Sequence, residues 1–137
     1  VGFTSGIGCS AGDWQGGGIG FTFLSSVVNN AETICSEYDA SKYTGIAFDS
    51  WGTGDVRIEI CTADVLNQAS DDCHGAVFVA TNTWTQHTFH WGDLTQRGFD
   101  NPPKIVAFNS ARIRKVQFLS LAADYNFAVD NLSFTTN

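Results

Sequence analysis

The sequence predicts an all-β fold, an antiparallel β-sandwich of the jelly-roll type with two sheets and little helix. Three observations support this prediction. Short runs rich in β-branched and aromatic residues follow one another from residue 43 to residue 134, and Gly, Asn, Asp or Ser bounds each run. No long stretch with helical periodicity separates these runs. Successive short strands without intervening helices are typical of sandwiches and jelly rolls.

Each expected strand is a short run enriched in residues that favour a pleated surface. The first spans residues 19–24 in a glycine-rich stretch, and the polar segment 29–40 after it is expected to be a loop. Later strands are expected at residues 43–48, 56–60, 75–79, 84–91, 115–119 and 127–134. The length of 137 residues and the absence of an internal repeat predict a single domain, residues 1–137.

Side chains alternate between the two faces of a strand, which separates the expected core from the expected surface. Ile46 and Phe48 share one face of their strand, whereas Asp49 and Trp51 point the other way. The apolar set predicts the sandwich core. The polar set predicts an outer sheet surface, which carries Asp49, Trp51, Arg57, Glu59, Gln86 and Gln117.

The composition excludes several classes of partner. Charged residues make up 15% of the chain, and the formal net charge is −7 without a basic cluster. Such a chain is repelled by nucleic acid and by anionic lipid. No apolar run approaches the roughly 20 residues that cross a membrane. We therefore expect neither nucleic acid nor a membrane as a partner.

The four cysteines predict two disulfides and an oxidising, extracellular compartment. They are Cys9, Cys35, Cys61 and Cys73, and their spacing matches no zinc pattern. Of the three possible pairings we favour Cys9–Cys35 with Cys61–Cys73, because Cys61 ends one expected strand and Cys73 opens the next. Four buried free thiols are the alternative.

The sequence offers little catalytic chemistry, so no enzyme is expected. Cleavage of a glycosidic bond needs two carboxyl groups about 5–9.5 Å apart. Asp49 and Glu59 are the only strand-borne pair that could share a surface, and a charge ladder with Arg57 is the alternative interpretation. No nucleophile elbow and no zinc-protease motif is present. A small glycan-cleaving enzyme that uses Asp49 and Glu59 remains the alternative function.

The tryptophans differ in their expected roles, because an indole ring can pack in a core or stack on a sugar. Trp91 and Trp84 are expected to be structural. Trp51 points away from the core beside a Gly-Thr-Gly turn, which favours a ligand-stacking role over capping of the sandwich edge. Trp14 and Tyr125 are the next candidates for contact with a ligand.

Four segments, taken together, resemble a known family. Residues 43–48, 73–76, 84–96 and 127–134 are similar to those of bacterial carbohydrate-binding modules with a galactose-binding-like jelly roll, and the resemblance covers residues 10–134. Such modules are often attached to cellulases and related plant-wall hydrolases. The resemblance implies a noncatalytic, secreted β-sandwich that holds a covalently linked catalytic domain on polysaccharide.

The expected ligand is a neutral β-glucan with β-1,4 or mixed linkages, bound by a monomer. Trp51 would stack on a sugar ring, and the polar residues Asp49, Arg57, Glu59 and Gln117 would bond its hydroxyl groups. Asp49 and Trp51 depart from the family pattern, which has an aromatic residue near position 49 and a small or basic residue at 51. A structural or adhesive sandwich without a sugar site is a third interpretation.

The resemblance also implies a structural calcium ion with Asp130 as an oxygen ligand. Asp130 stands between Val129 and Asn131 in the last expected strand. The alternative is that its carboxylate bonds backbone amides at a strand end.

Overall fold

The computed structural model describes residues 18–136 except 24, 29–31, 69 and 122–124, and the regular secondary structure of this part consists mainly of antiparallel strands. The only α-helix among the described residues is a single turn, α1 (Ala63–Leu66), and none there is long and apolar enough to cross a membrane. The strands are β1 (Gly18–Thr22), β2 (Ser25–Val28), β3 (Glu32–Cys35), β4 (Gly45–Thr62), β5 (His74–Ala80), β6 (Thr85–His90), β7 (Ile113–Ser120) and β8 (Asn126–Thr135). The predicted all-β sandwich with little helix is confirmed.

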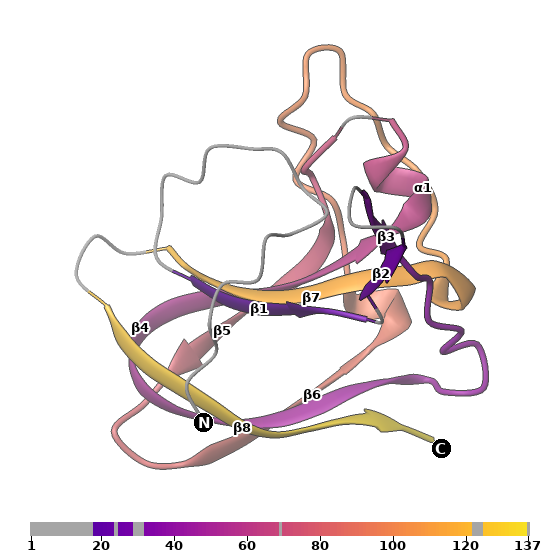
Figure 1. Ribbon diagram of the computed structural model, residues 1–137. Coiled ribbons are helices and arrows are strands. Elements are labelled where there is room, and N and C mark those ends of the chain that lie inside the picture. The colour runs from indigo at the N-terminus through magenta and orange to yellow at the C-terminus, as the bar shows by residue number, and fades with distance from the viewer. Residues whose placement is uncertain (1–17, 24, 29–31, 69, 122–124, 137) are drawn as a thin grey trace.

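Strand β4 joins the two large sheets by passing through both of them (Figure 1). Its first half lies between β6 and β8, and its second half lies between β5 and β7, with β1 added beyond β7. Gly52 and Gly54 adopt positive φ angles of 144° and 92° where the strand changes sheet. A side chain on Gly52 would collide with the carbonyl oxygen of Asn126, so glycine is needed there.

The core lies between the two halves of β4. Its residues Ile46, Phe48 and Ile58 are almost completely buried, as the alternation predicts. The ring of Phe48 contacts Phe78 and Phe118 from the opposite sheet, with centroids 5.0 and 4.9 Å away. Full burial of each such side chain contributes about 1.5–3 kcal/mol. The bend in β4 therefore brings two apolar faces of one strand together.

One of the two predicted disulfides falls in the described part of the chain. Cys61 and Cys73 are bonded at 2.04 Å and link the end of β4 to the start of β5. Val65 of α1 packs against them, so the loop that the disulfide closes has a small core of its own. Cys9 of the predicted Cys9–Cys35 pair lies outside the described residues, so that pairing stays a prediction. Strands β2 and β3 pair with each other in a separate two-stranded sheet.

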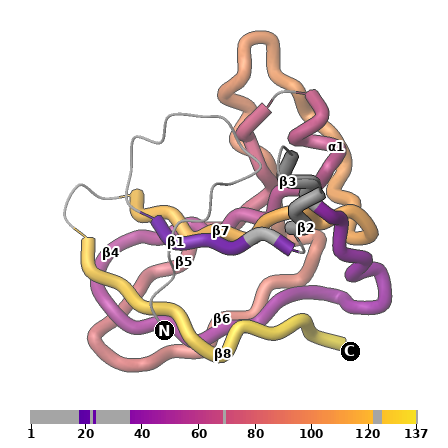
Figure 2. Tube along the Cα trace, viewed as in Figure 1, coloured from indigo at the N-terminus to yellow at the C-terminus, as the bar shows by residue number. Residues whose placement is uncertain are grey.

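The segment between β6 and β7 rises from the sheets as a long loop (Figure 2). It begins and ends with short 3₁₀ turns, η1 (Trp91–Asp93) and η2 (Ser110–Arg112). The buried carboxylate of Asp72 fixes it by accepting the backbone N–H groups of Arg97 and Gly98 at 2.8 and 2.5 Å. The amide of Gln96 adds bonds to the carbonyl oxygen of Asp72 and to the N–H of Val106. The loop is thus attached to the start of β5.

Candidate functional site

The structure divides the predicted site between two surfaces. Asp49 and Trp51 lie on the outer side of the sheet formed by β6, β4 and β8. Arg57 and Glu59 lie on the outer side of the other sheet, because β4 has changed sheet at residues 52–54. Gln117 of β7 stands opposite Glu59 on that second surface. The interpretation of these residues as one outer surface is therefore wrong.

We call the outer side of the β1–β7–β4–β5 sheet the ion-pair face. Its charged side chains Arg57 and Glu59 are buried and bind one another. Glu59 is 1% exposed, accepts hydrogen bonds from Arg57 Nε at 2.9 Å and Gln117 Nε2 at 2.7 Å, and forms an ion pair with Arg97 at 3.0 Å. Arg57 also donates to the carbonyl oxygen of Thr95 at 2.5 Å. Buried charges are tolerated when paired and hydrogen-bonded in this way. These groups already have partners, so the geometry lends no support to their predicted role in bonding sugar hydroxyls.

This arrangement also decides against the predicted pair of catalytic carboxylates. Asp49 and Glu59 lie on the outer sides of two different sheets, so they cannot flank one glycosidic bond. Glu59 is in addition buried against two guanidinium groups. The charge-ladder interpretation of Glu59 with Arg57 is confirmed.

The outer side of the β6–β4–β8 sheet, which we call the tryptophan face, carries its side chains in rows across the three strands. One row consists of Gln86, Asp49 and Asp130, and the next holds Thr88, Ala47 and Ser133. All of the β6 and β8 members of these rows are exposed. Asp49 accepts one hydrogen bond, from Asn131 Nδ2 at 2.7 Å. Carboxylate and amide groups are therefore open to solvent along this face.

Trp51 and Trp84 both lie at one end of the tryptophan face. The last pair of the β4–β6 ladder is Ser50 with Thr85, so Trp51 and Trp84 each stand one residue beyond it. On its other side Trp51 faces the small side chain of Ala128. Consecutive rows on one face are about 7 Å apart along a strand. The two indole positions thus adjoin the row of Asp49.

The prediction that Trp84 has a structural role is wrong, because this residue is 57% exposed. It directly precedes β6 at the end of a polar turn that begins with Thr81. That position at the end of a polar turn was the available signal in the sequence. Trp91 is structural as predicted, because its Nε1 donates to the carbonyl oxygen of Tyr43 at 2.7 Å and its ring packs beside Phe108.

The other two aromatic candidates are not part of the tryptophan face as described. Tyr125 is 46% exposed, but its ring lies against Phe127, with centroids 6.0 Å apart. Phe127 packs on the core, whereas its neighbour Ala128 lies on the side of Trp51. Tyr125 therefore belongs to the inner side of β8. Trp14 lies outside the described residues.

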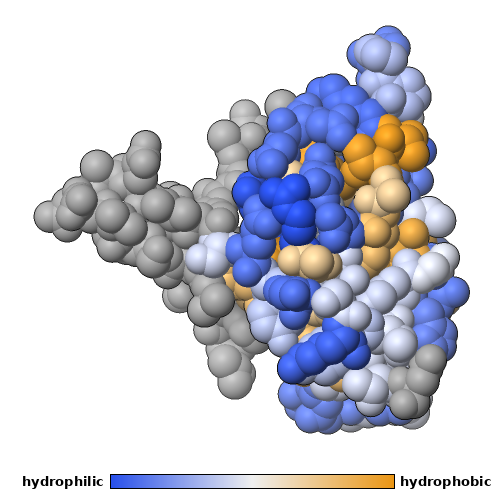
Figure 3. Space-filling model, turned by 90° about the vertical axis from the view of Figure 1, so that its right-hand side faces the viewer, coloured by the Kyte–Doolittle hydropathy of each residue, from blue (hydrophilic) through white to orange (hydrophobic). Residues whose placement is uncertain are grey.

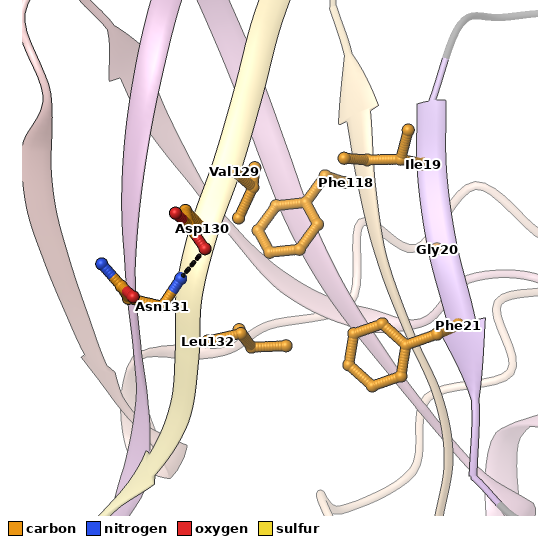
Figure 4. Close-up of a pocket in the computed structure, with 8 residues that line it drawn as sticks. All are labelled: Ile19, Gly20, Phe21, Phe118, Val129, Asp130, Asn131 and Leu132. Atoms are coloured by element: carbon orange, nitrogen blue, oxygen red, sulfur yellow. Dashed lines mark hydrogen bonds between the residues drawn. The ribbon is translucent and has the colours of Figure 1, made fainter. Parts of the chain in front are cut away.

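Asp130 stands at the rim of a hollow between β1 and β8 with a volume of about 130 Å³ (Figure 4). The side chains of Phe21, Phe118 and Leu132 make this hollow apolar, and Asp130 points away from them. Its Oδ1 accepts the N–H of Asn131 at 2.8 Å. Asn131 has a φ of 52°, where β8 is irregularly paired with β4.

The described residues do not fit a calcium ion at Asp130. Calcium takes six to eight oxygen ligands, several of them carboxylates. Within the described ranges no three acidic, histidine or cysteine side chains gather at one point. The bond from Asn131 agrees with the alternative in which Asp130 holds a backbone amide. Calcium at Asp130 stays a prediction.

His87 lies directly beneath the tryptophan face on the core side of β6. Its ring is 4.6 Å from that of Phe78 and 5.4 Å from that of Phe48, measured between centroids. Its Nε2 is 2.9 Å from Ser50 Oγ, and Ser50 stands between Asp49 and Trp51 in the chain. Burial lowers the pKa of His87, and the charge of Asp49 opposes that shift. The His87 ring thus supports, from the core side, the strand that carries Trp51.

One side of the described surface is mainly polar (Figure 3), in keeping with a sandwich whose outer faces meet water. Figure 3 shows one side on which polar side chains prevail and apolar ones gather toward one margin. Among the described residues, the exposed large apolar side chains are Val77, Val79, Trp84, Phe99, Ile105, Leu121 and Tyr125.

The two large antiparallel sheets form a sandwich whose fold is that of known carbohydrate-binding modules, which confirms the fold that the resemblance implied. In particular, the fold is similar to that of the family 11 carbohydrate-binding module of a cellulosomal cellulase of Clostridium thermocellum. That match has a TM-score of 0.67 at 16% identity and covers 88% of this chain and 66% of the other.

A second similar structure is a family 11 module from Clostridium thermocellum in complex with a β-1,3-1,4-mixed-linked tetrasaccharide. Its TM-score is 0.61 at 14% identity, with 91% of each chain covered. No protein-family model matches the sequence, and no curated protein is significantly similar to it. At these identities the comparisons show the fold.

Proposed function

We propose that this chain is a noncatalytic module that binds a neutral plant-cell-wall polysaccharide through the tryptophan face. One observation carries the proposal: Trp51 and the exposed Trp84 stand at the same end of a solvent-facing sheet, beyond a row of polar side chains that includes Asp49. Aromatic rings suit the apolar faces of sugars, and the adjoining amide and carboxylate groups suit their hydroxyls. The similar fold of carbohydrate-binding modules supports the same class of ligand.

The ligand we propose is a β-glucan with β-1,4 or mixed linkages. The tryptophan face carries Asp49 and Asp130, and β6, β8 and the first half of β4 (residues 45–53) include no lysine or arginine among their described residues. Acidic polysaccharides would be repelled there, whereas neutral chains would not. Such glucans lie outside cells, so the proposal includes secretion and a covalently linked hydrolase whose substrate the module holds. The mixed-linked tetrasaccharide bound by the second similar structure supports this choice.

The test is calorimetry of the Trp51→Ala variant with a soluble mixed-linkage glucan. By analogy with base–aromatic stacking, loss of one platform costs about 1–3 kcal/mol. Affinity should therefore fall roughly five- to a hundredfold, at 1.4 kcal/mol per decade. Trp84→Ala should weaken binding as well. Phe99→Ala is the matched control, because Phe99 is also an exposed aromatic but lies in the loop that Asp72 anchors.

Three outcomes would contradict the proposal. Release of reducing sugar from glucan would make the chain an enzyme. Absence of retardation in affinity gels with any neutral polysaccharide would leave a structural sandwich. If both tryptophan variants bound glucan like the parent and Phe99→Ala lost affinity, the binding site would lie away from the tryptophan face, near Phe99.

A further inference from the structure

Strand β5 ends the β1–β7–β4–β5 sheet with an edge that has no partner over most of its length in the described structure. Among the described residues, its only backbone pairing beyond β4 is at its start, where Gly75 and Thr95 exchange two hydrogen bonds of 3.0 Å. In an antiparallel strand both backbone groups of a residue point to the same side, and this side alternates along the chain. The N–H and C=O groups of Val77 and Val79 therefore point outward like those of Gly75.

The same two residues also expose their side chains. Val77 is 49% exposed and Val79 is 56% exposed, and both stand on the ion-pair face, opposite Arg57 and Asp55. Phe78 between them points into the core and is 5% exposed. Two valines thus present apolar side chains and free backbone groups at one short edge. Natural proteins protect such edges because they pair with other strands.

The other edge strands of the two large sheets show the protection that β5 lacks. β8 has an irregular register and Asn131 at a left-handed φ, and it carries Asp130. β6 exposes the polar side chains of Gln86 and Thr88, and β1 is five residues long with two glycines. β5 spans seven residues without lysine, acid, proline or a register shift. Only β5 among these described edges is regular and apolar.

We infer that β5 pairs with β5 of a second copy of this chain, in an antiparallel and twofold symmetric manner. Around a twofold axis at Phe78, Val77 of one copy faces Val79 of the other, and the reverse holds equally. Both pairs would exchange backbone hydrogen bonds, because the groups of both residues point outward. The four valine side chains would then form one apolar cluster on the joined sheet. A second copy fits this edge because its donors, acceptors and valines are self-complementary.

The pairing extends the proposed function without depending on it. Two copies joined at β5 would present two tryptophan faces to one polysaccharide, which raises the strength of attachment through avidity. It replaces the monomer that the sequence analysis expects. Because both copies carry a formal net charge of −7, their repulsion opposes pairing, and salt should strengthen it.

The experiment is sedimentation equilibrium of the whole chain over a range of concentrations, without glycan. The apparent mass should rise with concentration toward twice the monomer mass and stop there. Once the two β5 edges pair, neither is left to bind a third copy. Val79→Lys should raise the protein concentration at which half of the chains are paired by at least tenfold. The free chain should tolerate this lysine, since Asp55 stands opposite position 79 on β4. Thr88→Lys, on the polar edge strand β6, is the matched control and should pair like the parent.

Amide hydrogen exchange gives a second measure that does not depend on the variants. The Val77 and Val79 amides should become slower to exchange as concentration rises, whereas the amides that β6 exposes should not change. A monomer mass at all concentrations up to roughly 1 mM would overturn the inference. Growth beyond two copies, or equal behaviour of Val79→Lys and Thr88→Lys, would also overturn it.

Discussion

The two halves of β4 follow the same alternation but end with different surroundings. In the first half the outward residues Asp49 and Trp51 stay partly open to solvent on a three-stranded sheet. In the second half Arg57 and Glu59 point outward just as regularly, yet both are buried. The difference arises from the segment after β6, which lays Thr95 and Arg97 over the second half. Alternation therefore reports which side of a sheet a residue takes, and not what covers that side.

The largest expected effect comes from removing the charge at the centre of the ion-pair face. Glu59→Ala would leave Arg57 buried without its carboxylate, and breaking a buried pair costs about 3–5 kcal/mol. Chemical denaturation should show that loss of unfolding free energy. The folded fraction should keep its glucan affinity, because the tryptophan face is on the other sheet. Loss of affinity in the folded fraction would show that the two faces are coupled.

Asp49→Ala makes the converse comparison in the first half of β4. Asp49 is partly exposed and has one side-chain partner, Asn131, so its removal should change the unfolding free energy by less than about 1 kcal/mol. Glucan affinity, measured by calorimetry, should fall instead. A variant that loses stability like Glu59→Ala would contradict the contrast between the two halves.

The sequence predicts the core of this fold well because the period of a strand is a local property. Ile46, Phe48 and Ile58 are buried as expected, and the Cys61–Cys73 bond follows from the order of two strands. The change of sheet at residues 52–54 could not be predicted in this way. It depends on close approach of Gly52 to β8, more than seventy residues later in the chain.

The candidate site was harder to predict than the core because its residues come from distant segments. Glu59 binds Arg97 and Gln117, which lie 38 and 58 residues further along the chain. No local pattern encodes those contacts. Trp84 shows the same limit: its place at the same end of the sheet as Trp51 follows from the β4–β6 register and not from its own neighbours in sequence.

The disulfide should affect the second half of β4 and spare the first. Cys61 and Cys73 close a loop with a sequence separation of 12, and loops of this size gain about 3 kcal/mol in the chain-entropy model. The Cys61→Ala/Cys73→Ala double variant should lose about that much unfolding free energy, as measured by urea denaturation. Faster amide exchange is expected in α1 and at Gly98, with β6 unchanged. Equal loosening of both sheets would contradict this division.

The response to acid should come from two partly buried histidines, His87 beneath the first half of β4 and His74 at the start of β5. The pKa of His87 is lowered by burial in the folded state, so the unfolded chain takes up a proton first as the pH falls. Stability should therefore decrease from above the ordinary pKa of about 6.5 down to the lowered folded value, and change no further below it. His74 has a lowered pKa as well, so each histidine should account for part of the slope. His87→Gln, compared with His74→Gln in thermal melts between pH 8 and 5, separates the two.

The smallest expected effect lies at the end of the row that contains Asp49. Asp130 is exposed, and its Oδ1 accepts only the adjacent N–H of Asn131, a bond that the amide oxygen of an asparagine can also accept. Asp130→Asn should change the unfolding free energy by less than about 0.5 kcal/mol, as is usual for surface positions. Melting curves with and without a calcium chelator should then coincide for parent and variant alike. A lower midpoint with chelator in the parent alone would show that Asp130 holds a cation, because an ion that binds only the folded chain stabilises it. Its remaining ligands would then have to come from outside the described residues, and the polar row of the tryptophan face would end at a metal site.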